Sequence, residues 1–161
     1  IIDRFVEFMP YDTADFLKKL HKADELLDET AKPIAMSDEN RRYIEELDFK
    51  KILSHRRRNA AILERELAAS AKAGKLRFMS RSESTAGLYW GVLLENRDAV
   101  QKFMAERSIY CPVIWPIPKE AEGVCENCEY VAGHMLALPC DQRYGEGDME
   151  HIAAALKAAL D

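Results

Sequence analysis

Five side chains that could bind a metal or change oxidation state lie in the last third of the chain. Cys125 and Cys128 form a Cys-x-x-Cys pair, with Cys111 upstream and His134 and Cys140 downstream. Thiolate and imidazole groups in this number suit zinc, whereas two close thiols alone suit a disulfide that forms and breaks. A zinc site of this kind usually has a second close pair, and here the other candidates are single residues. The sequence favours reduced thiols and leaves zinc and a redox disulfide as alternatives.

A second group of side chains suited to binding lies just before the last expected helix. Asp141, Gln142, Arg143 and Tyr144 follow one another in a loop between a proline and a glycine-flanked helix start. A guanidinium binds a carboxylate through two parallel hydrogen bonds, and loops held by rigid elements often carry binding residues. We therefore predict that Arg143 and Tyr144 contact an anionic group of a substrate, the alternative being a loop that only caps the helix. Trp115, beside two prolines, either lines a substrate cleft or belongs to the core.

The motifs of several common catalytic sites are missing from the sequence. It contains no glycine-rich phosphate loop, no Gly-x-Gly-x-x-Gly, no His-Glu-x-x-His and no serine nucleophile elbow. A catalytic lysine needs a buried setting, and the lysines here lie in polar helical stretches or loops. We therefore assign no catalytic residue and no cofactor-binding residue.

Composition and charge place the chain among globular proteins. It has 161 residues, which suit one compact core, and 48% of them are hydrophobic. Lys and Arg number 23 against 28 Asp and Glu, a net charge of −5, which argues against binding to nucleic acid or to anionic lipid. The basic run Arg56-Arg57-Arg58 is interpreted as a solvated helix face, or else as an anion contact. No apolar run reaches the roughly 20 residues of a membrane span, so we expect a cytoplasmic protein.

The first half of the chain has a helical pattern. Phe16, Leu20, Ala23 and Leu27 would lie on one face of a first helix. Ser37 is a good N-cap for a short second helix that reaches about residue 47. A third helix is expected between a cap at residue 48 and about residue 74, with a mainly apolar stripe formed by residues 49, 52, 53, 60, 63 and 67 together with Arg56.

The second half changes to short strands alternating with helices. Residues 76–79, 88–95 and 109–115 are predicted strands, and Pro112 places the last of them at an edge or a bulge. Asn96 caps a helix between the second and third strands, and a short apolar segment at 131–138 leads to a closing amphipathic helix. The predicted fold class is α+β: a small antiparallel or mixed sheet of about three strands, covered on one face by helices.

Read in order, several segments resemble one known family. These are RRRNAAILERELA (56–68), a strand ending in LLE, RDAVQKFMAERSIYCPVIWPIP (97–118) and MLALPCDQRYGEGDMEHIAAAL (135–156). The landmarks are the Arg-Asn pair in the first segment, the helix-to-strand step at Ser108-Ile109 and the Pro-rich end in the third, and the Leu-Pro step in the fourth. The whole is similar to the C-terminal small domain of DegT-like aminotransferases, which are fold-type I pyridoxal-phosphate enzymes.

The resemblance implies a function for a larger protein. Many of these enzymes aminate keto sugars linked to nucleotides, for amino-sugar and polysaccharide biosynthesis, and a complete enzyme is expected to be a homodimer that holds pyridoxal phosphate. The family commonly carries a His-Tyr pair where this sequence has Ile114-Trp115, which predicts a divergent branch whose acceptor is a keto sugar or a related small molecule.

The resemblance also implies that this chain is a fragment. Residues 1–34 would be a helical lead-in and residues 35–161 the small domain, while the family's large domain supplies the lysine that bonds the cofactor. We therefore expect these residues alone to be inactive, with the large domain as their partner. The alternative is a stand-alone binding or zinc-stabilised interaction module on the same scaffold.

Overall fold

The computed structural model describes residues 18–19, 22–23, 25–26, 35–80, 87–114 and 117–161. The chain divides into two units, Ile1–Leu47 and Asp48–Asp161. In the first unit, the six described residues before position 27 are helical and exposed. The predicted apolar face of the first helix falls mostly on residues outside the described ones. The predicted domain boundary at residue 34 does as well.

The second predicted helix is present in the first unit as α3 (Asp38–Glu45). Ser37 caps it as expected, because its hydroxyl accepts a hydrogen bond from the Asn40 amide at 3.2 Å. Acidic residues occupy its first turn, which the helix dipole favours. All described side chains of α3 are exposed.

The long helix α4 (Phe49–Lys72) confirms the third predicted helix and begins the second unit. The Asp48 carboxylate caps it by accepting a hydrogen bond from the Lys51 amide at 3.0 Å. Gly74 follows its end with φ of +74°, a conformation that glycine adopts without strain. One face of the helix is buried, through Asn59, Ala60, Ile62, Leu63 and Leu67.

Three antiparallel strands form one sheet in the order β1 (Arg77–Phe78), β2 (Tyr89–Leu93), β3 (Met135–Pro139). In the β2–β3 pair, Trp90 lies opposite Leu138 and Val92 lies opposite Leu136. All four of these side chains are at most 6% exposed, because successive side chains alternate between faces and these four share the core face. The opposite face carries Tyr89, Gly91 and Met135, which are only partly covered.

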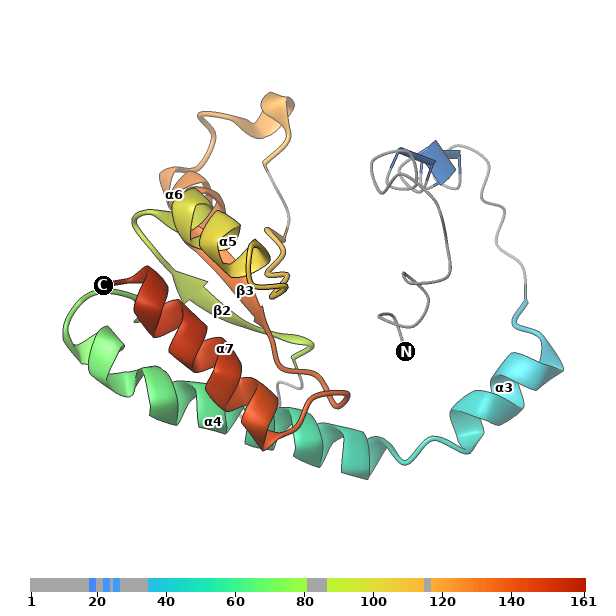
Figure 1. Ribbon diagram of the computed structural model, residues 1–161. Coiled ribbons are helices and arrows are strands. Elements are labelled where there is room, and N and C mark those ends of the chain that lie inside the picture. Colours follow the sequence, from blue (N-terminus) through green and yellow to red (C-terminus); the bar gives the residue numbers. More distant parts are fainter. Residues whose placement is uncertain (1–17, 20–21, 24, 27–34, 81–86, 115–116) are drawn as a thin grey trace. The chain divides into compact units, whose positions relative to one another are not determined.

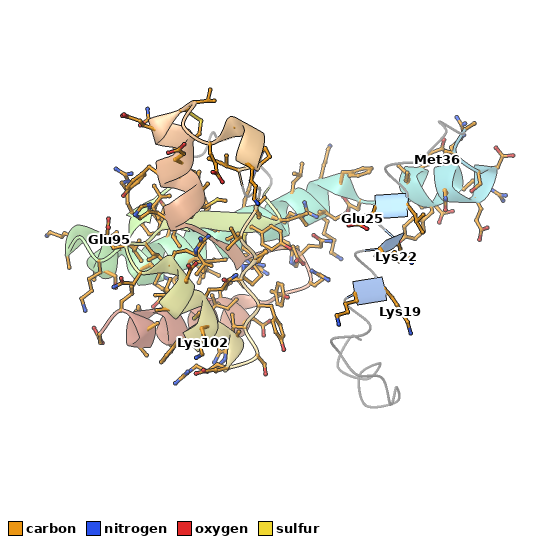
Figure 2. All side chains as sticks on the ribbon, turned by 90° about the horizontal axis from the view of Figure 1, so that it is seen from above. Lys19, Lys22, Glu25, Met36, Glu95 and Lys102 are labelled. Carbon is orange, nitrogen blue, oxygen red and sulfur yellow. A yellow bond between two sulfur atoms is a disulfide. The ribbon has the colours of Figure 1, made fainter. Side chains whose placement is uncertain are left out.

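The remaining helices are α5 (Arg97–Ala105), α6 (Glu126–His134) and α7 (Glu146–Ala159), with a short 3₁₀ turn at Lys119–Ala121. Helix α7 packs along α4 and also against α5, and these three helices line the core with the sheet (Figure 1). Helix α6 lies on the other side of the strands from α5 and α7 (Figure 2). The predicted α+β class with a three-stranded sheet is therefore confirmed, but helices lie on both sides of the sheet and not on one face only. Among the described residues, no helix is long and apolar enough to cross a membrane.

The predicted strand at 109–115 was wrong, and the third strand is residues 135–139. Residues 109–114 have no strand assignment. Pro112 has no N–H to donate, and its carbonyl oxygen accepts a single hydrogen bond, from the Ala137 amide at 3.2 Å. The segment therefore runs beside the outer edge of β3 without forming a ladder, while the apolar segment predicted at 131–138 is divided between the end of α6 and β3.

Candidate functional site

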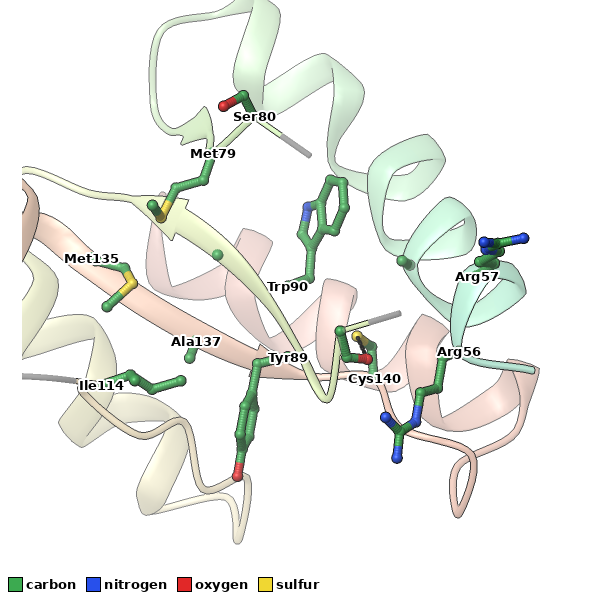
Figure 3. A pocket seen from close by; sticks show the side chains of 13 residues that line it. Arg56, Arg57, Met79, Ser80, Tyr89, Trp90, Ile114, Met135, Ala137 and Cys140 are labelled. Atoms are coloured by element: carbon green, nitrogen blue, oxygen red, sulfur yellow. Dashed lines mark hydrogen bonds between the residues drawn. The ribbon is translucent and has the colours of Figure 1, made fainter. Parts of the chain in front are cut away.

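A hollow of about 230 Å³ is lined by residues from both faces of the sheet and from α4 (Figure 3). Its wall is largely apolar, with polar groups from α4 and from the ends of the strands. The lining residues are Arg56, Arg57, Ala60, Met79, Ser80, Gly87, Tyr89, Trp90, Gly91, Ile114, Met135, Ala137 and Cys140. A concave, mainly apolar site with few polar groups is the usual form of a small-molecule site.

One glycine shapes the floor of this hollow. The Met79 amide donates to the Gly91 carbonyl at 3.0 Å, which extends the β1–β2 pairing by one residue. A Cβ atom at Gly91 would lie 2.7 Å from the sulfur of Met79, closer than two such atoms can approach. The absence of a side chain at Gly91 therefore lets Met79 lie across β2.

The polar edge of the hollow is formed by α4 and by the loop that follows β3. The Arg56 guanidinium donates through Nε to the side-chain oxygen of Gln142 at 2.6 Å. This contact joins residues 86 positions apart in the sequence. Arg57 follows on the same helix and is exposed. From the sequence, the run Arg56-Arg57-Arg58 is interpreted as a solvated helix face or as an anion contact. Its first two arginines border the hollow.

A buried amide holds the turn formed by residues 141–144. Asn59 is fully buried in α4, and its Nδ2 donates to the carbonyl oxygens of Asp141 and Tyr144, each at 2.9 Å. Backbone carbonyls that are removed from water need such donors. Because both partners can only accept, they also fix which way the amide of Asn59 faces. The turn is therefore anchored directly to the longest helix.

The same turn contains a buried carboxylate that orients an exposed arginine. Asp141 is only 2% exposed, and its oxygens accept from the Arg143 amide at 2.9 Å, from Nε at 2.9 Å and from an Nη atom at 2.7 Å. Hydrogen bonding from Arg143 lowers the pKa of Asp141, which therefore stays charged at neutral pH. The Arg143 side chain is 63% exposed. Two N–H groups of the guanidinium thus donate to Asp141, and its other N–H groups can bind an anion.

The structure brings together some of the predicted site residues. Arg143 lies 5.8 Å from the centroid of the Tyr144 ring, and Tyr144 packs against the core from its half-buried position. Tyr89 lines the hollow. Trp115 lies outside the described residues.

Two residues of this site were not assigned a role from the sequence. Asn59 appeared only as part of a family landmark, and Asp141 only as one of four loop residues. The signal that could have found Asn59 is its position, since an amide on the apolar face of a helix needs buried partners.

The cysteines do not come together as a metal site. Cys125 and Cys128 are joined by a disulfide, whereas the sequence favoured reduced thiols. Cys111 and Cys140 are buried thiols outside the disulfide, and burial raises the pKa of Cys111 to about 12. Among the described residues, no group of three or more His, Cys, Asp and Glu side chains is placed to hold a metal ion.

The histidine among the zinc candidates has other contacts. The His134 ring stacks on that of Tyr130 at 4.0 Å between centroids, and its Nε2 lies 3.6 Å from the carboxylate of Glu95. These contacts lie around the end of α6. We therefore describe His134 as part of a surface cluster.

The donor set of the hollow suits anions. Arginine, serine and tyrosine side chains line it, and none of its lining residues in the described part of the chain is a lysine or a carboxylate. Such a site can bind a phosphate or carboxylate group through Arg56 or Arg57. By itself it offers no amine that could bond covalently to a carbonyl group.

Comparison with known proteins identifies similar sequences and structures. The sequence model of the DegT/DnrJ/EryC1/StrS aminotransferase family matches residues 44–157. No curated protein matches the chain. Among solved structures, the aminotransferase TlmJ from Streptoalloteichus hindustanus is 20% identical with a TM-score of 0.56, over 69% of this chain and 33% of that one.

Two further structures match to a similar degree. The sugar aminotransferase CalS13 from Micromonospora echinospora is 19% identical with a TM-score of 0.60, over 68% of this chain and 31% of that one. A DegT/DnrJ/EryC1/StrS aminotransferase from Brucella abortus is 15% identical with a TM-score of 0.55, over 68% and 31%. The matched region thus spans about a third of the length of these structures.

Proposed function

Because this chain belongs to the DegT/DnrJ/EryC1/StrS aminotransferase family, we propose that residues 35–161 are the small domain of a pyridoxal-phosphate-dependent aminotransferase that acts on a sugar. The observation that carries the proposal is the family match over residues 44–157. The fold supports it, since the chain resembles about a third of each of three aminotransferase structures, one of which is named a sugar aminotransferase.

In this proposal the chain forms a wall of the active-site cleft and does not hold the cofactor. Pyridoxal phosphate supplies an electron sink for the transfer of an amino group. The described residues around the hollow do not fit it, because they provide neither a lysine to bond it nor a carboxylate for its ring nitrogen. We therefore assign the cofactor to a large domain outside these residues, and we infer that the 161 residues alone are inactive.

The substrate contact in this proposal is the exposed edge of Arg143. Asp141 and the turn anchored by Asn59 fix the guanidinium before any ligand arrives, which lowers the entropy cost of binding. Tyr144 would pack beside the bound group, and we retain Trp115 as a cleft residue on the sequence argument. The ligand would be an anionic group of a keto sugar or a related acceptor.

The assembly and location follow from the family assignment. We infer that the complete enzyme is a homodimer and works in the cytoplasm. Size-exclusion chromatography with light scattering of the native product tests the first inference.

The first prediction concerns the protein made from its native gene. We expect a chain much heavier than these 161 residues, with an absorbance band of bound pyridoxal phosphate and a cofactor that borohydride fixes covalently to the chain. The measurement is intact mass together with an absorbance spectrum. A native product of only this size without a cofactor signal would contradict the proposal and favour a stand-alone binding module.

The second prediction concerns Arg143 in that complete enzyme. Arg143→Ala is expected to raise KM for the amino acceptor about tenfold or more with a smaller effect on kcat, because a charge-assisted contact to the substrate is lost. Arg143→Lys should restore little, since an ammonium group cannot make the two parallel hydrogen bonds.

The matched control is Arg107→Ala, which removes an exposed arginine that bonds the Phe103 carbonyl at the end of α5. Steady-state kinetics with varied acceptor provide the test. An unchanged KM for Arg143→Ala would remove Arg143 from the substrate site while leaving the family assignment in place.

A further inference from the structure

We propose that Cys125 and Cys128 form a reversible dithiol–disulfide site on α6, which exchanges electrons with dithiols. Neither cysteine lines the arginine-bordered hollow, although the apolar surface beside Cys128 shares Met79, Ile114 and Met135 with it, and the proposal does not depend on the proposed aminotransferase function. The backbone, the exposure of the two sulfur atoms and the neighbouring surface each support the proposal.

The start of α6 places the two cysteines at bonding distance. Cys125 is the N-cap residue of the nine-residue helix and Cys128 lies in its first turn. Their Cα atoms are 5.2 Å apart, within the range that a disulfide spans, and the structure joins the two sulfur atoms. The bond closes only a four-residue segment, so it adds little constraint to the fold as a whole. A structural staple is therefore a poor explanation for it.

The two sulfur atoms differ in a way that gives exchange a direction. Cys128 is exposed and Cys125 is half-buried, so an incoming thiolate reaches Cys128 first. The sulfur of Cys125 accepts a hydrogen bond from the Cys128 amide at 3.3 Å. The amide N–H groups at a helix start stabilise negative charge, and a stabilised thiolate is a better leaving group. Attack at Cys128 with departure of Cys125 is therefore the favoured route.

The exchange balances with a dithiol as the second reactant. Its first thiolate bonds to the sulfur of Cys128 and breaks the Cys125–Cys128 bond, leaving Cys125 as the thiolate. The second thiol of the reactant, as its thiolate, then attacks the first sulfur, which releases Cys128 and closes a disulfide in the reactant. The reactant loses two electrons and two protons, and Cys125 and Cys128 gain them as thiols.

The surroundings of Cys128 favour a peptide dithiol over a small acidic thiol. Cys128 borders an open, mainly apolar surface hollow, whose other lining residues are Met79, Ile114, Ile117, Asn127, Val131, Ala132 and Met135. Side chains beside a peptide dithiol could pack there. Glu126 and Glu129 lie in the same first turn of α6, and Glu129 accepts from the Gly123 amide. Their negative charge opposes the approach of an anionic thiol such as glutathione.

The test counts accessible thiols on the folded chain. The protein is first equilibrated with oxidised glutathione and then treated with iodoacetamide, with or without prior reduction by dithiothreitol. Intact mass should show no added group before reduction and two after it. The buried Cys111 and Cys140 should react only when the reduced chain is also unfolded, giving four. Dithiothreitol should reduce the site at least tenfold faster than glutathione at equal thiolate concentration.

Two matched variants test the direction of exchange. Cys125→Ser leaves the exposed sulfur, and with oxidised glutathione it should form a mixed disulfide at least tenfold faster than Cys128→Ser, which leaves the half-buried one. Equal rates in the two variants would overturn the assigned direction. Two groups added without reductant, or stoichiometric zinc that protects both thiols, would overturn the disulfide site itself.

Discussion

Asn59→Ala is expected to lower the free energy of unfolding by about 2–4 kcal/mol, because it leaves two buried carbonyl oxygens without their donor. The lost hydrogen bonds are those to Asp141 and Tyr144, each at 2.9 Å. Asn59→Asp should lower the free energy of unfolding by at least as much. The aspartate has the same shape, but it places a carboxylate oxygen, which can only accept, against the two carbonyl oxygens. Chemical denaturation at pH 7 measures both effects.

The matched control for Asn59 is Asn127→Ala. Asn127 is an exposed asparagine on α6, so its replacement should change the free energy of unfolding by less than about 0.5 kcal/mol. A loss below about 1 kcal/mol for Asn59→Ala would show that the turn at 141–144 does not rely on this amide. In that case the pre-orientation of Arg143 would need another cause.

The helices of the second unit could be predicted from the sequence because their signals are local. The cap at Asp48 and the recurrence of apolar residues along α4 are both read within a few turns of one helix. Helix α7 follows the same rule, with Met149, Ile152 and Leu156 buried at helical spacing. Such periodicity indicates that one face of the helix is buried, whichever element packs against it. These helices could therefore be predicted without knowledge of the tertiary structure.

The site could be predicted only in part, because its decisive contacts are long-range. The loop at 141–144 was found from its composition. Its anchor, Asn59, lies 82 positions before Asp141, and no local pattern links two such residues. The spacing of Cys125 and Cys128 was compatible with reduced thiols, a zinc site or a disulfide. The sequence could not separate these, because the backbone at the start of α6 sets the distance between the two sulfur atoms.

The assignment of the third strand failed because two apolar segments compete for one sheet edge. Residues 109–115 and 135–139 are both short and apolar, and propensity alone does not separate them. In the structure β3 pairs with β2 along its whole length, and from the described residues 109–114 the Pro112 carbonyl accepts a hydrogen bond from β3. Pairing with a strand more than 40 positions away is a tertiary property that the sequence pattern does not contain.

Replacing a buried leucine of β3 tests this assignment. Leu136 is fully buried and lies opposite Val92 in the sheet. Leu136→Ala should lower the free energy of unfolding by about 3–4 kcal/mol, through lost burial and the cavity that remains. Ile114→Ala removes a side chain of similar size from the competing segment. Because Ile114 is only half-buried, its replacement should cost about 1 kcal/mol.

Denaturation of the two variants under one set of conditions compares the segments directly. The difference between them is more informative than either value, since effects on the unfolded chain are similar for two branched aliphatic side chains cut to alanine. A larger loss for Ile114→Ala than for Leu136→Ala would place the segment at 109–115 in the core of the sheet. The hollow would then change as well, because Ile114 would turn inward and β3 would no longer supply Met135 and Ala137 to its wall.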